Sequence, residues 1–436
     1  MQKNILKSAK KIYFIGIGGI GISAIARLLL LEGKKVSGSD ISLSEVTDEL
    51  VNEGAIIIEG QSLDDIPIDT ELIIFTAAIE VADQDLYKKI KKLNIPSLSY
   101  SEALGIISSS KKTIAISGTH GKTTTTAMIA KILMEAKIDP SVIIGSMFLE
   151  TKTNYVAGLG EYLVVEADEY RRSFLSLHPY ILIINNIDAD HLDYYKDLAD
   201  VQSAFYELAM RVPSDGLIIC NTEDLNVKPV IKDVKCKIID YTKINFNGVT
   251  LKFPGEHNRQ NAKVALTVAE ALGVEEQLAK KALSNFSGTW RRFEYKGKMK
   301  NEALVYDDYA HNPQKVEAVI AGTREMYPNK KIIVVFQPHL FSRTKILLRE
   351  FSRVFNVADK IILLSIYPAR EAFDPSVSSE ILANEIIKFS GKINGEVDVK
   401  NKEEVLREVE KITDKNSIVL FIGAGDIYKL SEQLIK

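Results

Sequence analysis

The stretch Ile114–Thr123, which reads IAISGTHGKT, decides how the rest of the sequence is interpreted. A short apolar run leads into a turn with two glycines, and the turn ends in Gly-Lys-Thr where an amphipathic helix pattern begins. This order is typical of a phosphate-binding loop, because glycines let backbone N–H groups close around phosphate oxygens at a helix N-terminus. The loop is of a shorter kind, since Ile116 stands where the first glycine of the common pattern lies. The segment therefore predicts an α/β domain that binds ATP.

The residues of this loop have distinct expected roles. Lys122 is expected to reach the β- and γ-phosphates, and the hydroxyl of Thr123 is expected to ligate Mg²⁺. The positive end of the helix dipole further favours a bound anion. The loop residues that we expect at the ATP site are Gly118, Thr119, His120, Gly121, Lys122, Thr123 and Thr124.

Two other segments are candidates for the rest of the metal site. Glu166 ends the apolar run 162–166, and His191 follows the apolar run 180–186. The carboxyl ends of parallel strands meet at one edge of a sheet, which is where open α/β sheets bind their ligands. Carboxylates there can hold Mg²⁺ against nucleotide phosphates, whereas histidine is a less usual ligand of this ion. The sequence therefore predicts a metal site of Thr123, Glu166 and His191, with a purely structural role as the alternative for His191.

A second glycine-rich loop lies near the N-terminus, between a strand pattern at 11–17 and a helix pattern at 20–32. It fits the spacing G-x-G-x-x-G, and Asp40 follows about 20 residues later, as in the dinucleotide-binding fingerprint. By itself this pattern allows an NAD(P)-dependent oxidoreductase. The same geometry also suits the diphosphate of a nucleotide sugar, so the motif indicates a diphosphate more firmly than a nicotinamide. The residues assigned to this site are Gly16, Gly18, Gly19, Gly21, Ser39 and Asp40.

The overall composition limits the class of protein. The chain has 436 residues, enough for about three domains. Its 55 lysine and arginine residues nearly balance 58 aspartate and glutamate residues, so the net charge of -3 gives no general attraction to nucleic acid or anionic membranes. Two cysteines exclude a disulfide scaffold and suit a reducing compartment. No apolar stretch reaches the roughly 20 residues of a membrane-spanning helix. We therefore expect a cytoplasmic protein that binds neither nucleic acid nor membrane.

Apolar strand patterns alternate with helical patterns along the chain, which predicts parallel sheets with crossover helices. A polar stretch at 108–112 separates the first group of strands from the second. A basic stretch at 296–300 with little apolar content ends the second group. We therefore predict an α/β protein of three domains, with the ranges 1–108, 109–297 and 298–436.

Taken together, the motifs resemble those of the Mur ligases, the ATP-dependent amide-forming enzymes of peptidoglycan precursor synthesis. The segments that carry the resemblance are Gly118–Thr125, Glu166–Glu169, Asp188–His191, Gly255–Ala262, Arg291–Phe293 and Asp307–Pro313. Within the family, a further set of segments is similar to the members that join L-alanine to UDP-N-acetylmuramate. These segments are Gly16–Gly21, Gly38–Asp40, Phe336–His339, Ser342–Thr344, Tyr367–Ala369 and Gly423–Ile427.

The resemblance implies a fold, a reaction and its small-molecule partners. The first domain would be Rossmann-like and bind UDP-N-acetylmuramate, the second would be a phosphate-loop ATPase, and the third would be Rossmann-like and close on the nucleotide. ATP and Mg²⁺ would serve the formation of an acyl phosphate, which the amine of L-alanine then attacks. The protein would act as a monomer or dimer.

The resemblance also implies roles for single residues. Those implied to be catalytic are Lys122, Glu166, His191 and Arg292, of which Arg292 would reach the ATP phosphates. Asn258 and Asn261 would contact the nucleotide, Asp308 would hold its ribose, and His311 would close onto ATP. Thr76 would belong to the UDP-substrate site.

His339 and Arg343 follow the strand pattern 331–336, at the edge where an open sheet places its ligands. An arginine binds carboxylates in a bidentate manner, so we hypothesise that these two residues face the amino acid or the muramate group. An ordinary surface arginine and a capping histidine are the alternative.

The sequence departs from the family pattern at two places that bear on function. Thr76-Ala77 stands where serines are usual, and Tyr170-Arg171-Arg172 replaces small and acidic residues after Glu169. Three rival functions stay open at this point. They are a family member that attaches a whole peptide to UDP-N-acetylmuramate, an NAD(P)-dependent oxidoreductase, and a nucleotide-dependent switch without chemistry.

Overall fold

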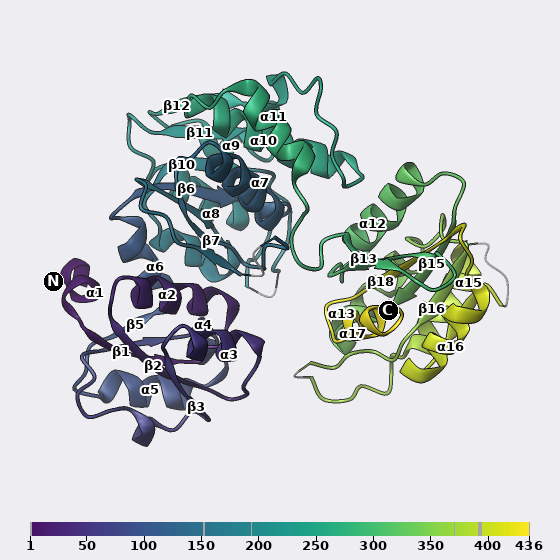
Figure 1. Ribbon diagram of the computed structural model, residues 1–436, viewed down its shortest axis with the longest axis horizontal. Coiled ribbons are helices and arrows are strands. Elements are labelled where there is room, and N and C mark those ends of the chain that lie inside the picture. Colours follow the sequence, from purple (N-terminus) through teal and green to yellow (C-terminus); the bar gives the residue numbers. More distant parts are fainter. Residues whose placement is uncertain (1, 151–152, 193, 370, 391–394, 436) are drawn as a thin grey trace. The chain divides into compact units, whose positions relative to one another are not determined.

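A computed structural model describes residues 2–150, 153–192, 194–369, 371–390 and 395–435 (Figure 1). The chain forms two compact units. The first unit comprises Met1–Thr250 with Arg259–Ser287, and the second comprises Leu251–Asn258 with Gly288–Lys436. The first unit contains two β-sheets and the second contains one.

The first sheet has five parallel strands in the order β3-β2-β1-β4-β5. Its strands are β1 (Lys11–Ile15), β2 (Lys35–Asp40), β3 (Ile56–Glu59), β4 (Leu72–Phe75) and β5 (Ser97–Ser99). The helices of this region are α1 (Gln2–Ser8), α2 (Ile20–Leu31), α3 (Glu45–Asn52), α4 (Ala77–Ala82), α5 (Gln84–Lys92) and α6 (Tyr100–Ser108).

Alternate residues of the first sheet enter two different cores, because successive side chains of a strand point to opposite faces. Phe14 and Ile74 pack in the core that α2 and α6 cover. Tyr13 and Ile73 pack instead with Ile90 of α5 on the other face. Both faces of the sheet are therefore buried, as expected for parallel strands joined by crossover helices.

The second sheet has seven strands in the order β12-β11-β10-β6-β9-β7-β8, and its one antiparallel pair among the described strands joins β7 to β8. Its strands are β6 (Lys112–Ser117), β7 (Ser141–Ile143), β8 (Tyr155–Val156), β9 (Tyr162–Glu166), β10 (Pro179–Ile184), β11 (Leu217–Cys220) and β12 (Lys237–Asp240). The helices of this region are α7 (Lys122–Glu135), α8 (Leu198–Ala209), α9 (Lys228–Ile231), α10 (Glu256–Ala271) and α11 (Glu276–Asn285).

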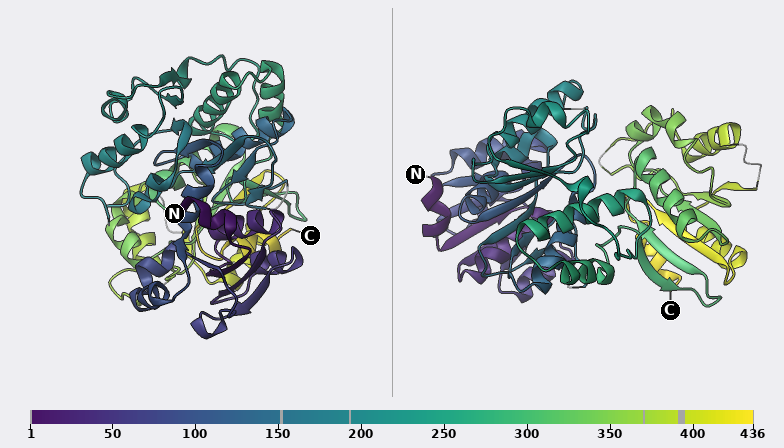
Figure 2. Two further views of the ribbon diagram at one scale, coloured as in Figure 1. Left: turned by 90° about the vertical axis from the view of Figure 1, so that its left-hand side faces the viewer. Right: turned by 90° about the horizontal axis from the view of Figure 1, so that it is seen from above.

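The third sheet has six strands in the order β13-β14-β18-β15-β16-β17, of which β13 pairs antiparallel at the edge. Its strands are β13 (Glu294–Lys298), β14 (Leu304–Asp308), β15 (Lys331–Phe336), β16 (Lys360–Leu363), β17 (Val397–Val399) and β18 (Ser417–Ile422). The helices of this region are α12 (Pro313–Met326), α13 (Phe341–Ile346), α14 (Leu348–Phe351), α15 (Ser379–Ser390), α16 (Lys402–Ile412) and α17 (Tyr428–Gln433). One face packs against α12, α14 and α15 and the other against α16 and α17 (Figure 2).

The predicted class, α/β with three sheets built mainly of parallel strands, is confirmed. The strand expected at 11–17 ends earlier, at Ile15, because Gly16 turns the chain with a φ of +77°. The basic stretch expected to end the second group of strands instead forms β13, so a boundary between residues 297 and 298 falls inside this strand. Among the described residues, no helix combines the length and the apolar character that crossing a membrane requires.

Candidate active site

The phosphate loop leaves β6 and enters α7 through Gly121, whose φ of +82° is in the left-handed region. A Cβ atom at this position would collide with the side-chain oxygen of Asn261 and lie 3.0 Å from the side-chain nitrogen of Asn185. The His120 N–H donates to the side-chain oxygen of Asn186 over 2.8 Å. The asparagines after β10 and Asn261 of α10 therefore hold the loop closely, and no residue larger than glycine fits at position 121.

Lys122, the first residue of α7, is held at the mouth of this loop. Its Nζ atom donates to the carbonyl oxygen of Gly118 over 2.8 Å and forms an ion pair of 2.6 Å with Oε2 of Glu169. The Glu169 side chain is 2% exposed, and this burial raises its pKa while the Lys122 ammonium opposes the rise. The sequence interpretation did not assign Glu169 a role. The sequence feature that could have indicated a role for Glu169 is its place in the acidic segment that follows β9.

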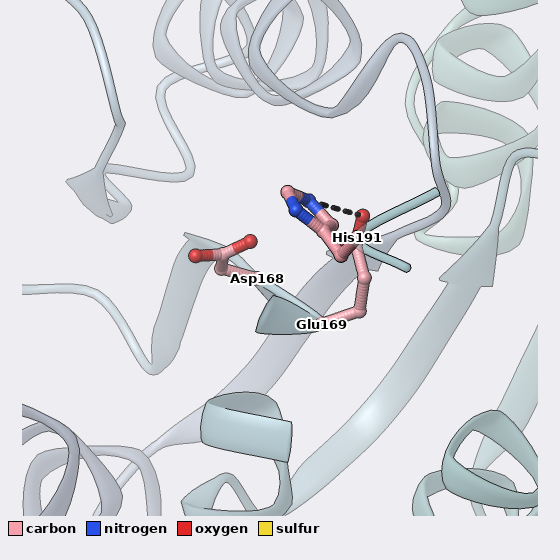
Figure 3. A group of neighbouring side chains, drawn as sticks. All are labelled: Asp168, Glu169 and His191. Atoms are coloured by element: carbon pink, nitrogen blue, oxygen red, sulfur yellow. Dashed lines mark ion pairs between the residues drawn. The ribbon is translucent and has the colours of Figure 1, made fainter. Parts of the chain in front are cut away.

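Glu169 also belongs to a cluster with Asp168 and His191 (Figure 3). One ligand atom from each of the three residues lies within 4.8 Å of the others, and Nε2 of His191 is 3.7 Å from Oε1 of Glu169. That Oε1 atom is buried and receives no hydrogen bond from the described residues. A buried carboxylate oxygen without a donor is costly, so a cation fits this cluster.

The other two residues of the predicted metal site meet directly. The Thr123 hydroxyl donates to Oε1 of Glu166 over 2.5 Å, and the other carboxylate oxygen of Glu166 accepts from the backbone N–H of Gly145. The structure thus pairs Thr123 with Glu166 and groups His191 with Asp168 and Glu169. Oxygen atoms dominate both groups, which suits Mg²⁺. The metal assignment itself stays a prediction.

The segment after Glu169, where the sequence departs from the family pattern, has an unusual backbone. Arg171 and Arg172 both have left-handed φ angles, of 52° and 58°. The Arg172 guanidinium forms an ion pair of 2.6 Å with Asp200 of α8, and the Tyr170 ring lies 4.9 Å from the His191 ring. The departure therefore anchors this turn to α8 and places an aromatic ring beside His191.

The N-terminal glycine loop lies at the carboxyl edge of the first sheet. The Gly18 N–H donates to Oδ2 of Asp40 over 2.8 Å, and the Gly16 N–H donates to the Ser39 carbonyl over 2.8 Å. A Cβ atom on Gly16 would come within 2.6 Å of the Thr76 methyl group. The structure therefore brings together the segments predicted to form the UDP-substrate site, namely Gly16–Gly21, Ser39, Asp40 and Thr76.

A cavity of about 280 Å³ lies within the first unit. Its walls include Gly21 and Tyr100 from the region of the first sheet, and Lys122, Glu166 and Asp168 from the second. The cavity therefore joins the end of the N-terminal glycine loop to the lysine of the phosphate loop.

In the second unit, Arg292 and Asp308 sit beside a buried ion pair. The Arg291 guanidinium bonds to Asp307 over 2.7 Å and to backbone carbonyls of the loop after β18. Next to it, the Arg292 guanidinium lies 5.6 Å from the centre of the Tyr309 ring. The Asp308 carboxylate accepts hydrogen bonds from two backbone N–H groups, and burial raises its pKa. Arg291 is thus a structural residue that fixes the turn before β13, in which Arg292 lies.

His311, His339 and Arg343 gather in the same unit. The rings of His311 and His339 are 6.2 Å apart, and Nη1 of Arg343 is 3.3 Å from Nδ1 of His339. Tyr367 stacks on His339 at 5.6 Å. Burial lowers the pKa of His311 to about 3, so this imidazole is neutral at physiological pH. Because Nδ1 of His311 donates to the Tyr309 carbonyl, Nε2 of the neutral ring can accept a hydrogen bond.

The two asparagines of α10 fall in different units. Asn261 belongs to the first unit and touches Gly121, whereas Asn258 belongs to the second and donates to the Pro254 carbonyl over 2.7 Å. The proximity of Asn261 to the phosphate loop agrees with its expected place beside a nucleotide. The nucleotide role of Asn258 stays a prediction.

Three family models match the chain. The Mur ligase family catalytic domain matches residues 11–112, the Mur ligase middle domain matches residues 116–248, and the Mur ligase glutamate ligase domain matches residues 291–425. A UDP-N-acetylmuramate–L-alanine ligase of Clostridium kluyveri is 39% identical over 450 residues, with 97% of each chain covered. The chain belongs to the Mur ligase family. It is therefore an ATP-dependent ligase and not the oxidoreductase that its first glycine loop alone would allow.

Other relatives of this Mur ligase agree. The UDP-N-acetylmuramate–L-alanine ligase of Aquifex aeolicus is 39% identical, with 98% of this chain and 97% of that chain covered. The crystal structure of the UDP-N-acetylmuramate-alanine ligase of Thermotoga maritima superposes with a TM-score of 0.79 at 28% identity, covering 97% of this chain and 98% of that chain. A murein peptide ligase of Psychrobacter arcticus has a TM-score of 0.71 at 23% identity and covers 98% of both chains, which shows a shared fold.

Proposed function

We propose that this Mur ligase joins L-alanine to the lactyl carboxylate of UDP-N-acetylmuramate and converts ATP to ADP and inorganic phosphate. The observation that carries the proposal is the cavity whose walls include both Gly21 and Lys122. A substrate with a diphosphate at one end and a carboxylate at the other would span these two loops. The relatives named for this reaction over nearly their whole length support the choice of substrates.

The chemistry requires activation, because a carboxylate is a poor electrophile. A lactyl carboxylate oxygen attacks the γ-phosphorus of ATP, ADP leaves, and an acyl phosphate forms. The ammonium group of L-alanine loses one proton, the resulting amine attacks the acyl carbon and forms the amide bond, and inorganic phosphate leaves as the nitrogen gives up a second proton. Lys122 and Arg292 would neutralise charge on the transferring phosphoryl group, and preorganised charges of this kind are the main catalytic device in phosphoryl transfer. Mg²⁺ held by Thr123, Glu166 and His191 would supply further neutralisation.

We assign the three expected domains to three parts of this reaction. Residues 1–108 would bind UDP-N-acetylmuramate, residues 109–297 would bind ATP, and residues 298–436, which begin within β13, would close on the nucleotide. Within the last range, Asp308 would hold the ribose and His311 would contact ATP. The enzyme would act in the cytoplasm as a monomer or dimer.

The amino-acid side of the reaction is assigned to His339 and Arg343, and it yields a first prediction. Arg343→Lys keeps the positive charge but loses the planar fork that grips a carboxylate. We expect the KM for L-alanine to rise by about tenfold, because hydrogen bonds to charged groups contribute roughly that much. The KM for ATP should change little. Initial rates at varied alanine and varied ATP would measure both constants.

The control for this prediction is Arg349→Lys, because Arg349 is an exposed arginine of the neighbouring α14. Equal KM values for alanine in the parent enzyme and in Arg343→Lys would contradict the assignment of His339 and Arg343 to the amino-acid site.

The proposed function is tested by phosphate release. The enzyme is incubated with ATP, Mg²⁺ and UDP-N-acetylmuramate, and with L-alanine, glycine, L-serine or a peptide that begins with L-alanine. Release that requires L-alanine, with formation of the matching amide, is the expected result. Release that requires the peptide would favour the peptide-attaching rival, whose fold is shared. Release with neither would overturn the proposal.

A further inference from the structure

Tyr100 occupies a fixed position at the start of α6. Its helix begins with a capping box, in which the Ser99 hydroxyl accepts from the Glu102 N–H over 3.2 Å and the Glu102 carboxylate accepts from the Ser99 N–H over 2.7 Å. Two reciprocal bonds of this kind fix the first turn of a helix. The backbone of Tyr100 is therefore held on both sides.

The Tyr100 ring packs on the last glycine of the N-terminal loop. A Cβ atom added to Gly21 would lie 2.8 Å from both the Cζ and the hydroxyl oxygen of Tyr100. The approach is possible because position 21 carries no side chain. The Tyr100 ring therefore packs directly against the backbone of Gly21. This contact places the phenol at the end of the loop expected to hold the diphosphate.

The hydroxyl of Tyr100 is a donor with no acceptor among the described residues. Tyr100 lines the cavity of about 280 Å³ together with Lys122, Glu166 and Asp168. None of the residues that the structure describes forms a hydrogen bond with this hydroxyl. Burial, followed by the charges of Glu166 and Asp168, raises the pKa of Tyr100, so the phenol keeps its proton and can donate.

Lys122 cannot hold an incoming carboxylate by itself. Two of its three N–H donors are already engaged, one by the Gly118 carbonyl and one by Glu169. The remaining donor is also required by the phosphate of ATP. A carboxylate that enters among Lys122, Glu166 and Asp168 meets two negative side chains, so it needs a further donor to stay in place.

We propose that the Tyr100 hydroxyl donates a hydrogen bond to the lactyl carboxylate of the nucleotide-sugar substrate and thereby selects substrates that carry this carboxylate. This inference rests on the proposed function and adds to it a substrate-binding residue. The carboxylate reaches the γ-phosphate with one oxygen while Tyr100 holds the other. The phenol keeps its proton throughout. The hydrogen bond therefore orients the attacking carboxylate and does not protonate it.

The test compares two ligands that differ at the carboxylate. UDP-N-acetylmuramate carries the lactyl ether, whereas UDP-N-acetylglucosamine has a free hydroxyl in its place. Isothermal titration with each ligand, in the presence of Mg²⁺ and a non-hydrolysable ATP analogue, measures the Kd for the parent enzyme and for Tyr100→Phe. The phenylalanine keeps the ring on Gly21 and removes only the donor.

We expect Tyr100→Phe to weaken UDP-N-acetylmuramate binding by about 10- to 100-fold, the range for a hydrogen bond to a charged group. Binding of UDP-N-acetylglucosamine should change by less than about twofold. Tyr87→Phe is the matched control, because Tyr87 lies in α5, packs on Phe75, and is not part of the cavity wall. The KM for UDP-N-acetylmuramate should rise in parallel with the Kd.

Equal losses for both ligands, or no loss for either, would overturn the assignment of Tyr100. If Tyr100→Phe does not reach the unfolding midpoint of the parent enzyme, Tyr100→His provides the second test, because its ring N–H is again a donor. Tyr100→His must then still bind UDP-N-acetylmuramate more tightly than UDP-N-acetylglucosamine. Loss of this preference would equally overturn the assignment. Phosphate release by the parent enzyme is measured alongside, so a failure of the proposed function is recognised separately.

Discussion

Replacing Lys122 with alanine is expected to lower the rate of amide formation by about 1,000-fold or more. Removal of a single preorganised charge-stabilising group typically costs two to three powers of ten, and Lys122 is in addition the residue that positions the phosphates. The Kd for UDP-N-acetylmuramate should rise by no more than about tenfold, because the one donor that Lys122 has left is shared between the carboxylate and the phosphate of ATP. Phosphate release and calorimetric titration would measure the two effects.

The variant has a side effect that must be separated from catalysis. Without Lys122, the buried carboxylate of Glu169 loses its ion pair, and breaking such a pair costs about 3–5 kcal/mol of stability. The double variant Lys122→Ala/Glu169→Gln removes this unpaired charge and should recover stability but not activity. The control is Lys131→Ala, which alters another lysine of the same helix, paired with Glu135 and Glu150. Near-parental turnover in either Lys122 variant would contradict the phosphate-loop assignment.

Much of the candidate site is predictable because its information is local. Gly-Lys-Thr after an apolar strand defines the phosphate loop, and Glu166 ends the neighbouring strand of the sheet. Parallel neighbours bring their carboxyl ends to one edge, so the contact of 2.5 Å between Thr123 and Glu166 follows from topology. The same reasoning brings Asp40 to the N-terminal glycine loop.

The rest of the candidate site depends on where individual side chains lie, and the spacing of residues along the sequence does not determine this. Glu169 lies 47 residues from Lys122, and three acidic residues compete for the same role within Glu166–Glu169. Which carboxylate pairs with the lysine is decided by the turn after β9, where Arg171 and Arg172 adopt left-handed angles. The packing of Tyr100 on Gly21 is equally non-local.

The stretch near residue 297, where the second group of strands was expected to end, shows a different limit of the sequence. Its lysines and low apolar content suggested the end of a domain, and the structure forms β13 there, which pairs with β14 on one side and is the edge of its sheet. An edge strand is commonly charged, because lysines discourage pairing with other chains. Lys296 is in fact bound by Glu294 and Glu432. Polar composition therefore does not distinguish an edge strand from the end of a domain here.

Glu169→Gln is expected to lower kcat by about 10- to 100-fold, the usual effect of changing a group that orients catalytic or metal-binding residues. The carboxylate contacts Lys122 at 2.6 Å and His191 at 3.7 Å. A glutamine has one oxygen and one NH₂ group, so it can accept from one of these partners while its NH₂ faces the other. Either orientation displaces a cationic or metal-binding side chain. Initial rates at varied Mg²⁺ should also show a higher Mg²⁺ requirement.

The matched control is Glu161→Gln, which makes the same chemical change just before the opposite end of β9. Glu161 forms an exposed pair of 2.9 Å with Lys112, and exposed pairs of this kind contribute little to stability. This control should leave kcat, the Mg²⁺ requirement and the unfolding midpoint nearly unchanged. If Glu169→Gln lowers only the unfolding midpoint, Glu169 serves stability alone. If it lowers kcat at an unchanged midpoint, the buried carboxylate sets the positions of Lys122 and His191 during the reaction, since the two variants differ in what the carboxylate touches and not in the charge removed.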